Sequence, residues 1–165
     1  MLGVRLPARG ALQILDGRFN ELLARIPLDV DLTDEDCPAD VIDERAPAAE
    51  LWRRLCDETK GAGWVVAHKL CARKRPRLLP AYDDVVKRAL QPKCDSFWVP
   101  LWRELRDPAL VRRLHQVRSS AGLDERVPLL RVLDAAVWMR NEGITQVEKD
   151  RPAGLAPLPF LAREP

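Results

Sequence analysis

The sequence predicts an all-α protein, and three observations support this prediction. Apolar residues recur at intervals of three and four along most of the chain, as they do on one face of a helix. Proline and glycine separate these stretches where helices begin and end. No run alternates between apolar and polar residues for long enough to build a sheet, and no internal repeat is visible. We therefore expect a compact multi-helix bundle.

Length and charge point to one domain without an overall electrostatic bias. A chain of 165 residues suits a single domain and buries about two-thirds of the surface that its unfolded form exposes. The chain has 27 Lys and Arg against 25 Asp and Glu, which gives a formal net charge of +2. The whole chain is therefore not strongly attracted to nucleic acid or to a membrane. Any such attraction must be local.

The cysteines do not predict a metal site. Cys37, Cys56, Cys71 and Cys94 are separated by 19, 15 and 23 residues, whereas zinc and iron–sulfur sites usually need close pairs. No signal-peptide pattern opens the chain, and no apolar run reaches the roughly 18 residues of a membrane span. We expect a soluble cytoplasmic protein with reduced thiols, no metal, no cofactor and no membrane partner.

The N-terminal third predicts two helices joined by an acidic connection. Pro7 suits a first helical turn, and apolar spacing predicts a helix over about 7–26. Residues 27–46 carry many carboxylates and few large apolar groups, so they are predicted to form a long surface connection. A calcium loop is the alternative, but the glycine and the ligand alternation of such loops are missing. Pro47 then opens a second helix that runs to about Thr59.

Three further helices are predicted in the middle of the chain. They span about 64–73, 80–90 and 96–106, and the last of these is rich in tryptophan. A basic connector, 73–77, joins the first two.

The C-terminal third predicts two more helices and a tail. Asp107 and Pro108 form a cap and a first-turn proline for a helix that stops near Gly122. The most apolar helix, about 128–142, is expected to be the central element of the core. We expect a single helical domain over 1–142, followed by a Pro-rich, mostly disordered tail over 143–165.

A Gly-x-Gly turn at Gly61 and Gly63 lies between two apolar helical stretches, which is typical of a helix-hairpin-helix motif over about 48–73. Two glycines let a turn approach a phosphate, and the free amides that begin the next helix donate to that phosphate. Nearby basic side chains can neutralise adjoining phosphates. The candidate nucleic-acid-binding residues are Gly61, Gly63, Lys69, Arg73, Lys74, Arg75 and Arg77. A plain interhelical turn followed by a solvated basic loop is the alternative.

Residues 61–86 resemble the helix-hairpin-helix DNA glycosylases, in which an apolar-Asp step follows the hairpin. Here that step is Leu79 to Val86, and Asp83 matches the essential aspartate. The resemblance implies a carboxylate that stabilises positive charge on the sugar, and a pocket that receives a flipped base. Trp64, Tyr82 and Trp98 are the candidate pocket residues. DNA is accordingly the candidate partner.

The sequence also departs from the glycosylase pattern. Val65 stands where bifunctional members have a lysine that attacks the sugar, and Thr59-Lys60 replaces the usual apolar lead-in. If the protein is an enzyme, it is therefore expected to be a monofunctional hydrolase. An inactive relative that kept the nucleic-acid-binding hairpin is the alternative.

Nearly the whole chain also resembles a family of uncharacterised helical proteins from high-GC bacteria. The resemblance is carried by residues 67–83, Phe97-Trp98, 129–134 and 138–140. It implies a helical fold and no particular activity.

A structural or protein-interaction module is the alternative function. In this interpretation Arg73, Lys74, Arg75, Tyr82 and Asp83 form a polar network that stabilises the fold, and the acidic connection meets a protein partner. Asp83 would then pair with Arg73 or Arg75. His68 is expected to be a packing or helix-surface residue.

Overall fold

The computed structural model describes residues 5–90 and 98–149, with the backbone alone described over 142–149. The described parts are helical, and no strand occurs in them, which confirms the predicted all-α class. The predicted tail from 150 onwards, Ser96 and Phe97 lie outside the described residues.

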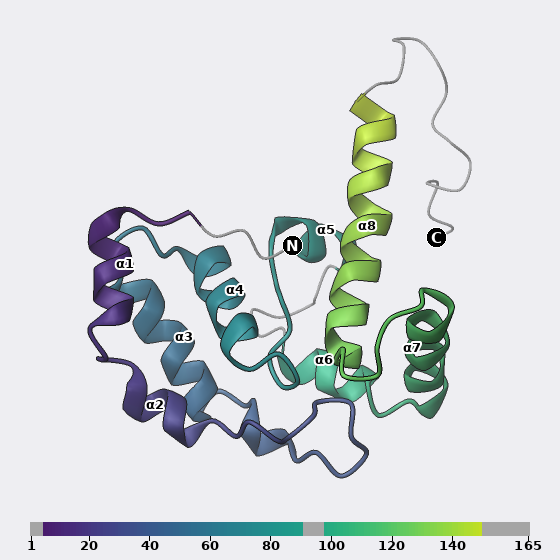
Figure 1. Ribbon diagram of the computed structural model, residues 1–165, viewed down its shortest axis with the longest axis horizontal. Helices are drawn as coiled ribbons and strands as arrows, with labels where there is room; N and C mark the ends of the chain where they lie inside the picture. The colour runs from purple at the N-terminus through teal and green to yellow at the C-terminus, as the bar shows by residue number, and fades with distance from the viewer. Residues whose placement is uncertain (1–4, 91–97, 150–165) are drawn as a thin grey trace.

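Four helices form one side of the molecule (Figure 1). They are α1 (Ala8–Leu15), α2 (Asn20–Arg25), α3 (Pro47–Glu58) and α4 (Trp64–Lys74). The helix predicted over 7–26 is wrong as a single element, because the chain turns at Gly17, whose φ is +88°. Asp16 stabilises this turn by accepting a hydrogen bond from the Arg18 amide at 3.1 Å. The helices predicted from Pro47 and Trp64 are confirmed.

The connection between α2 and α3 has one short 3₁₀ helix, η1 (Ala39–Val41). The prediction that it lies on the surface is wrong in part, because Leu32, Cys37 and Ile42 are all buried in the core. The Arg106 guanidinium fastens this segment by donating to the carbonyls of Leu32 at 2.5 Å and Glu35 at 2.9 Å. The few apolar groups of an acidic segment are therefore enough to anchor it.

The other side of the molecule consists of α5 (Asp84–Leu90), α6 (Trp98–Glu104), α7 (Pro108–Ser120) and α8 (Leu129–Lys149). The helix predicted over 80–90 begins four residues late, because the chain is not helical from Pro80 to Asp83. Asp107 caps α7 as predicted, since its carboxylate accepts from the Ala109 amide at 2.8 Å. α7 ends just before Gly122, which has a φ of +64°.

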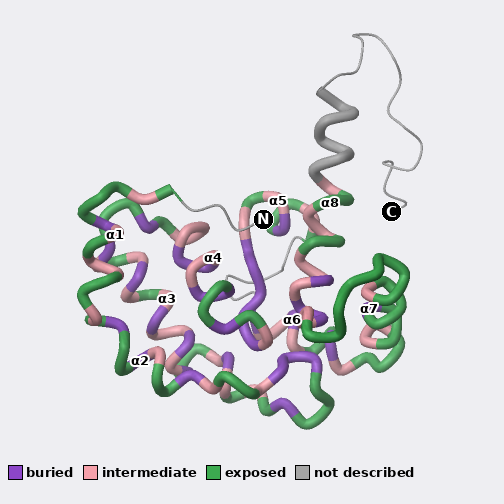
Figure 2. Tube along the Cα trace, viewed as in Figure 1, coloured by how far each residue is buried: buried purple, intermediate pink, exposed green. Residues whose placement is uncertain are grey.

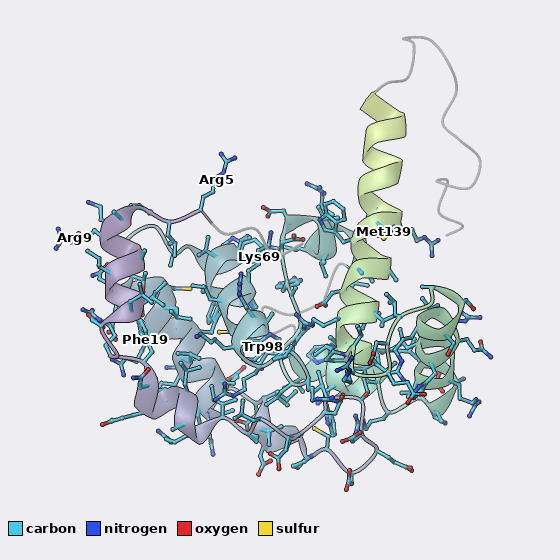
Figure 3. All side chains as sticks on the ribbon, in the orientation of Figure 1. Arg5, Arg9, Phe19, Lys69, Trp98 and Met139 are labelled. Carbon is cyan, nitrogen blue, oxygen red and sulfur yellow. The ribbon has the colours of Figure 1, made fainter. Side chains whose placement is uncertain are left out.

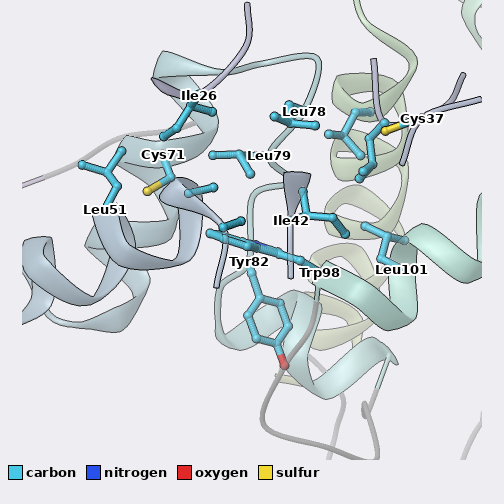
Figure 4. Close-up of a cluster of buried hydrophobic side chains, with 14 of the residues drawn as sticks. Ile26, Cys37, Ile42, Leu51, Cys71, Leu78, Leu79, Tyr82, Trp98 and Leu101 are labelled. Atoms are coloured by element: carbon cyan, nitrogen blue, oxygen red, sulfur yellow. The ribbon is translucent and has the colours of Figure 1, made fainter. Parts of the chain in front are cut away.

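The core lies where α3, α4, the acidic segment and the link between α4 and α5 meet. Figure 2 shows the link as a buried trace through the middle of the molecule, and residues 78–82 are all buried. Figure 4 shows Leu78 and Leu79 of this link among Ile26, Ile42 and other core side chains. Cys71 of α4 belongs to the same cluster and is fully buried, which raises the pKa of its thiol to about 12.

The prediction that α8 is the central element of the core is wrong. Leu129, Leu130 and Val132 are buried, but Ala135, Ala136 and Met139 are exposed. α8 packs on α5 and α7 through its first half and then extends beyond them (Figure 1), to Lys149 rather than to the predicted end near 142.

Candidate functional site

A cavity of about 420 Å³ lies between α4, α5 and α8. Lys69 and Arg73 come from α4, Ala81 and Asp83 from the link, and Val86 from α5. α8 contributes the remaining lining residues, which are Arg131, Asp134, Ala135, Trp138 and Met139. Lys69 and Met139 are labelled in Figure 3 on their respective helices. The cavity thus joins an apolar wall to a group of charged side chains.

Asp83 lies in this cavity and holds the start of α5. Its Oδ1 atom accepts hydrogen bonds from the amides of Val85 and Val86, both at 3.1 Å. Its Oδ2 atom forms an ion pair with Lys69 Nζ at 3.3 Å. These contacts explain why the non-helical link ends in an aspartate, since a carboxylate satisfies the free amides of a helix start. The predicted partners Arg73 and Arg75 are not the ones the structure brings to Asp83.

Asp134 is a second carboxylate in the cavity, and it pairs with Arg131 one helical turn earlier. Asp134 Oδ2 lies 2.9 Å from an Arg131 nitrogen and accepts from the Ala81 amide at 3.1 Å. Burial raises the pKa of Asp134 to about 6, with a smaller contribution from the charge of Asp83, although Arg131 and the Ala81 amide oppose the shift.

Arg131 is incompletely paired. One of its terminal nitrogens donates to the Leu79 carbonyl at 2.5 Å. Its Nε and Nη1 atoms are buried and find no partner in the described part of the chain. Arg131 therefore keeps unused hydrogen-bond donors beside its ion pair with Asp134.

The site residues predicted from the sequence do not include Arg131, Asp134, Trp138 or Met139. An Arg and an Asp spaced by three on an apolar helix were a usable signal, since that spacing places them on one helix face. The joining of this face to Asp83 depends on tertiary packing.

The four cations of the basic connector have different environments. Arg73 and Lys74 are exposed, and neither side chain has an ion-pair partner within the described ranges. Arg75 is buried and donates to the carbonyls of Ile26 at 2.8 Å, Lys74 at 2.8 Å and Leu23. Arg77 pairs with Asp31 at 3.2 Å. Only Arg73 and Lys74 remain available for an external anion.

The Gly-x-Gly turn joins α3 to α4, and α1 covers part of it. Gly61 has a φ of +81°, and a Cβ there would lie 2.7 Å from Pro7 Cδ. The Lys60 amide donates to the Gln13 side chain at 2.9 Å. Gly63 is open, since a Cβ there would have no atom within 4 Å. The turn and Arg73 stand at opposite ends of α4, roughly 15 Å apart along its axis.

The three predicted pocket residues gather elsewhere, around His68. The rings of Trp64, Tyr82 and Trp98 lie 6.0, 5.3 and 5.6 Å from the imidazole, and the Trp52 ring lies at 5.1 Å. None of these aromatic residues lines the cavity beside Asp83.

His68 is a packing residue whose imidazole is held neutral. Its Nδ1 atom lies 2.8 Å from the Trp52 indole nitrogen and 2.9 Å from the Trp64 carbonyl. The same nitrogen cannot accept from the indole and donate to the carbonyl at once. Burial lowers the pKa of His68 to about 4, against the opposing contact with the Trp64 carbonyl. The neutral ring therefore accepts from Trp52.

Neither a metal site nor a membrane-spanning helix occurs among the described residues. Across residues 5–90 and 98–141, no three His, Cys, Asp or Glu side chains are grouped to hold a metal ion. None of the described helices combines the length and the apolarity that crossing a bilayer needs.

Fold and site together define a class: an all-helical protein with a charged, partly apolar cavity between three helices. Residues 1–141 match the model of the "Family of unknown function (DUF6308)", and the chain belongs to that family. No curated protein and no solved structure matches the chain.

Proposed function

We propose that this protein binds nucleic acid through the exposed cations of the three helices that surround the cavity. Exposed cations on α4, α5 and α8 outnumber exposed carboxylates among the side chains described there. The exposed cations are Arg73, Lys74, Lys87, Arg88 and Arg140, and Asp84 is the exposed carboxylate. This local excess carries the proposal, because the chain as a whole is nearly neutral.

Arg73 and Lys74 are the leading phosphate contacts. They are adjacent, exposed and without ion-pair partners in the described part of the chain, so binding a phosphate breaks no internal contact. The Gly63 end of α4 is a second candidate contact in a helix-hairpin-helix made of α3 and α4. Within the described ranges, no side-chain hydrogen bond caps the first amides of α4.

The proposal concerns binding rather than base excision. Both oxygens of Asp83 are engaged, by Lys69 and by the two amides of α5. These contacts favour a role for Asp83 in holding the link and α5 together. Arg75 likewise serves the fold through its three carbonyl contacts.

Salt-dependent binding tests the proposal. The affinity for a fluorescent duplex is measured by anisotropy at several salt concentrations, with polyglutamate as the competing acidic polymer. We expect the negative slope of log K against log salt to become shallower by about 2 in the Arg73→Gln/Lys74→Gln double variant, because two phosphate contacts are lost.

The matched control is Arg112→Gln/Arg113→Gln, which removes two adjacent exposed cations from α7. The slope is expected to stay as in the wild type. Equal slopes in the two double variants, or full competition by polyglutamate, would show that the protein does not bind nucleic acid at this surface.

A further inference from the structure

We infer that the cavity between α4, α5 and α8 binds a small organic anion that has an apolar body, such as an aromatic carboxylate. Arg73 belongs both to this site and to the proposed phosphate contacts, but none of the other residues that line the cavity is among those contacts. The inference therefore stands or falls separately from nucleic-acid binding.

The size and the walls of the cavity suit such a ligand. Its volume of about 420 Å³ falls within the range of small-molecule sites, which runs from roughly 300 to 1,000 Å³. The apolar part of the lining comes from Val86 of α5 and from Ala135, Trp138 and Met139 of α8. An indole and a thioether both offer polarisable apolar surface to a flat apolar group.

The charges of the cavity favour an anion. Three cations, Lys69, Arg73 and Arg131, face two carboxylates. Asp83 is compensated by Lys69 and two amides, and Asp134 by Arg131 and one amide. Arg73 has no ion-pair partner among the described residues, so a ligand carboxylate gains a charge-assisted hydrogen bond there without displacing any of them.

Two features of the cavity floor add to this preference. Two nitrogens of Arg131, Nε and Nη1, find no hydrogen-bond partner among the described residues, so this guanidinium has donors left for an acceptor. Asp134 uses only Oδ2 in hydrogen bonds with the described residues. Its remaining oxygen, when protonated, donates to an anionic ligand instead of repelling it.

Matched ligands test the charge requirement. Isothermal titration calorimetry is carried out on the full chain with 4-phenylbutyrate, its uncharged amide and 4-phenylbutylamine. We expect the carboxylate to bind at least roughly tenfold more tightly than the amide, as one charge-assisted contact implies. The amine is expected not to bind. Equal affinity for acid and amide would overturn the inference.

Matched variants test the location. Ala135→Trp places an indole in the cavity and is expected to abolish binding of 4-phenylbutyrate. Ala136→Trp adds the same side chain at the next position of α8, which is exposed and does not line the cavity, and is expected to bind like the wild type. Unchanged binding by a folded Ala135→Trp protein would exclude this cavity.

A final pair of variants separates this site from nucleic-acid binding. Arg73→Gln is expected to weaken 4-phenylbutyrate binding to the level of the amide. Lys74→Gln is expected to leave it unchanged while weakening duplex binding, because Lys74 does not line the cavity. An equal effect of both variants on 4-phenylbutyrate would contradict the assignment to Arg73. A wild-type protein that binds 4-phenylbutyrate but no duplex would support the cavity site and contradict only the proposed nucleic-acid binding.

Discussion

His68 shows how strongly the surroundings of one residue determine its chemistry. It lies on α4 and is enclosed by four aromatic rings, so that a charged imidazole would lose most of its hydration. The pKa of His68 is lowered to about 4 from the ordinary 6.5. The unfolded chain therefore binds a proton between pH 6.5 and 4 that the native protein does not bind. Stability contributed by His68 is lost as the pH falls through this window.

The first prediction concerns the pH dependence of stability. Asp134 acts in the opposite direction, because its raised pKa makes the native state the better proton binder between about 6 and 3.8. His68→Asn isolates the histidine, since asparagine keeps an acceptor for Trp52. We expect the stability advantage of the wild type over this variant to shrink by about 2 kcal/mol between pH 7 and pH 5.

Urea unfolding at several pH values measures this difference. His115→Asn, at an exposed position on α7, is the control and is expected to show no comparable change. A gap between wild type and His68→Asn that does not vary with pH would disprove the neutral imidazole.

The second prediction concerns Arg75. Its guanidinium joins the end of α4 to the carbonyls of Leu23 and Ile26 at the end of α2. Arg75→Gln leaves buried carbonyls without donors and is expected to cost about 2–4 kcal/mol in the free energy of unfolding. Lys74→Gln, next in sequence but exposed, is expected to change it by less than about 0.5 kcal/mol. Equal losses in urea denaturation would refute the structural role of Arg75.

At the scale of single residues, the sequence shows which side chains are charged or aromatic, but it does not show what surrounds each of them in the fold. The cations of 73–77 were predicted as one nucleic-acid-binding group, but Arg75 is buried and Arg77 is paired with Asp31. Their partners lie about 46 to 52 positions away in the chain, so no local pattern identifies them. The predicted aromatic pocket likewise depended on which face of each helix turns inward.

At the scale of the helices, α1 packs so closely against the α3–α4 turn that a glycine is needed at position 10. A Cβ at Gly10 would lie 2.2 Å from the Lys60 carbonyl oxygen. Since that oxygen belongs to the backbone, relief of the overlap requires that either α1 or the α3–α4 turn shifts. A helix without a side chain at this position is therefore required for α1 to pack on the turn.

The third prediction compares two glycines. Gly10→Ala is expected to destabilise the protein by about 1–3 kcal/mol through this overlap. Gly63→Ala meets no atom within 4 Å and has an ordinary φ of −67°, so the stability is expected to stay within about 0.5 kcal/mol of wild type. Thermal unfolding of the two variants measures both effects. A Gly10→Ala protein with wild-type stability would contradict the observed packing.

Helices with strong end signals were the ones predicted well. Pro47, Gly63 and Asp107-Pro108 mark the starts of α3, α4 and α7 correctly, because caps and first-turn prolines act locally. The break at Gly17 was missed because the apolar spacing continues across it into α2. The late start of α5 was missed because proline also fits a helical first turn.

For the whole molecule, the fold class was predictable and the assembly was not. Helical periodicity gave the all-α class, but the most apolar helix, α8, packs through only its first half. Apolar residues beyond Leu133 instead line the cavity, as Trp138 and Met139 do. The charged side of the site was therefore partly predicted, through Asp83, Lys69 and Arg73, and its α8 wall was not.

The fourth prediction follows from the way α8 extends beyond the other helices (Figure 1). Backbone amides at 131–133 are hydrogen-bonded next to buried side chains and are expected to exchange with deuterium slowly. Amides after Asn141 are expected to exchange at least roughly tenfold faster, because an isolated helix end opens without unfolding the core. Uniform protection along α8, measured by hydrogen exchange and mass spectrometry, would indicate a partner that covers its second half.

Because Cys71 is fully buried, its reaction with a thiol reagent reports opening of the core. A thiol with its pKa raised to about 12 and no contact with solvent does not react with an alkylating reagent in the native state. Its labelling therefore requires that α4 separates from the helices around it. The alkylation rate of this one sulfur atom therefore measures how often α4 separates from the rest of the core.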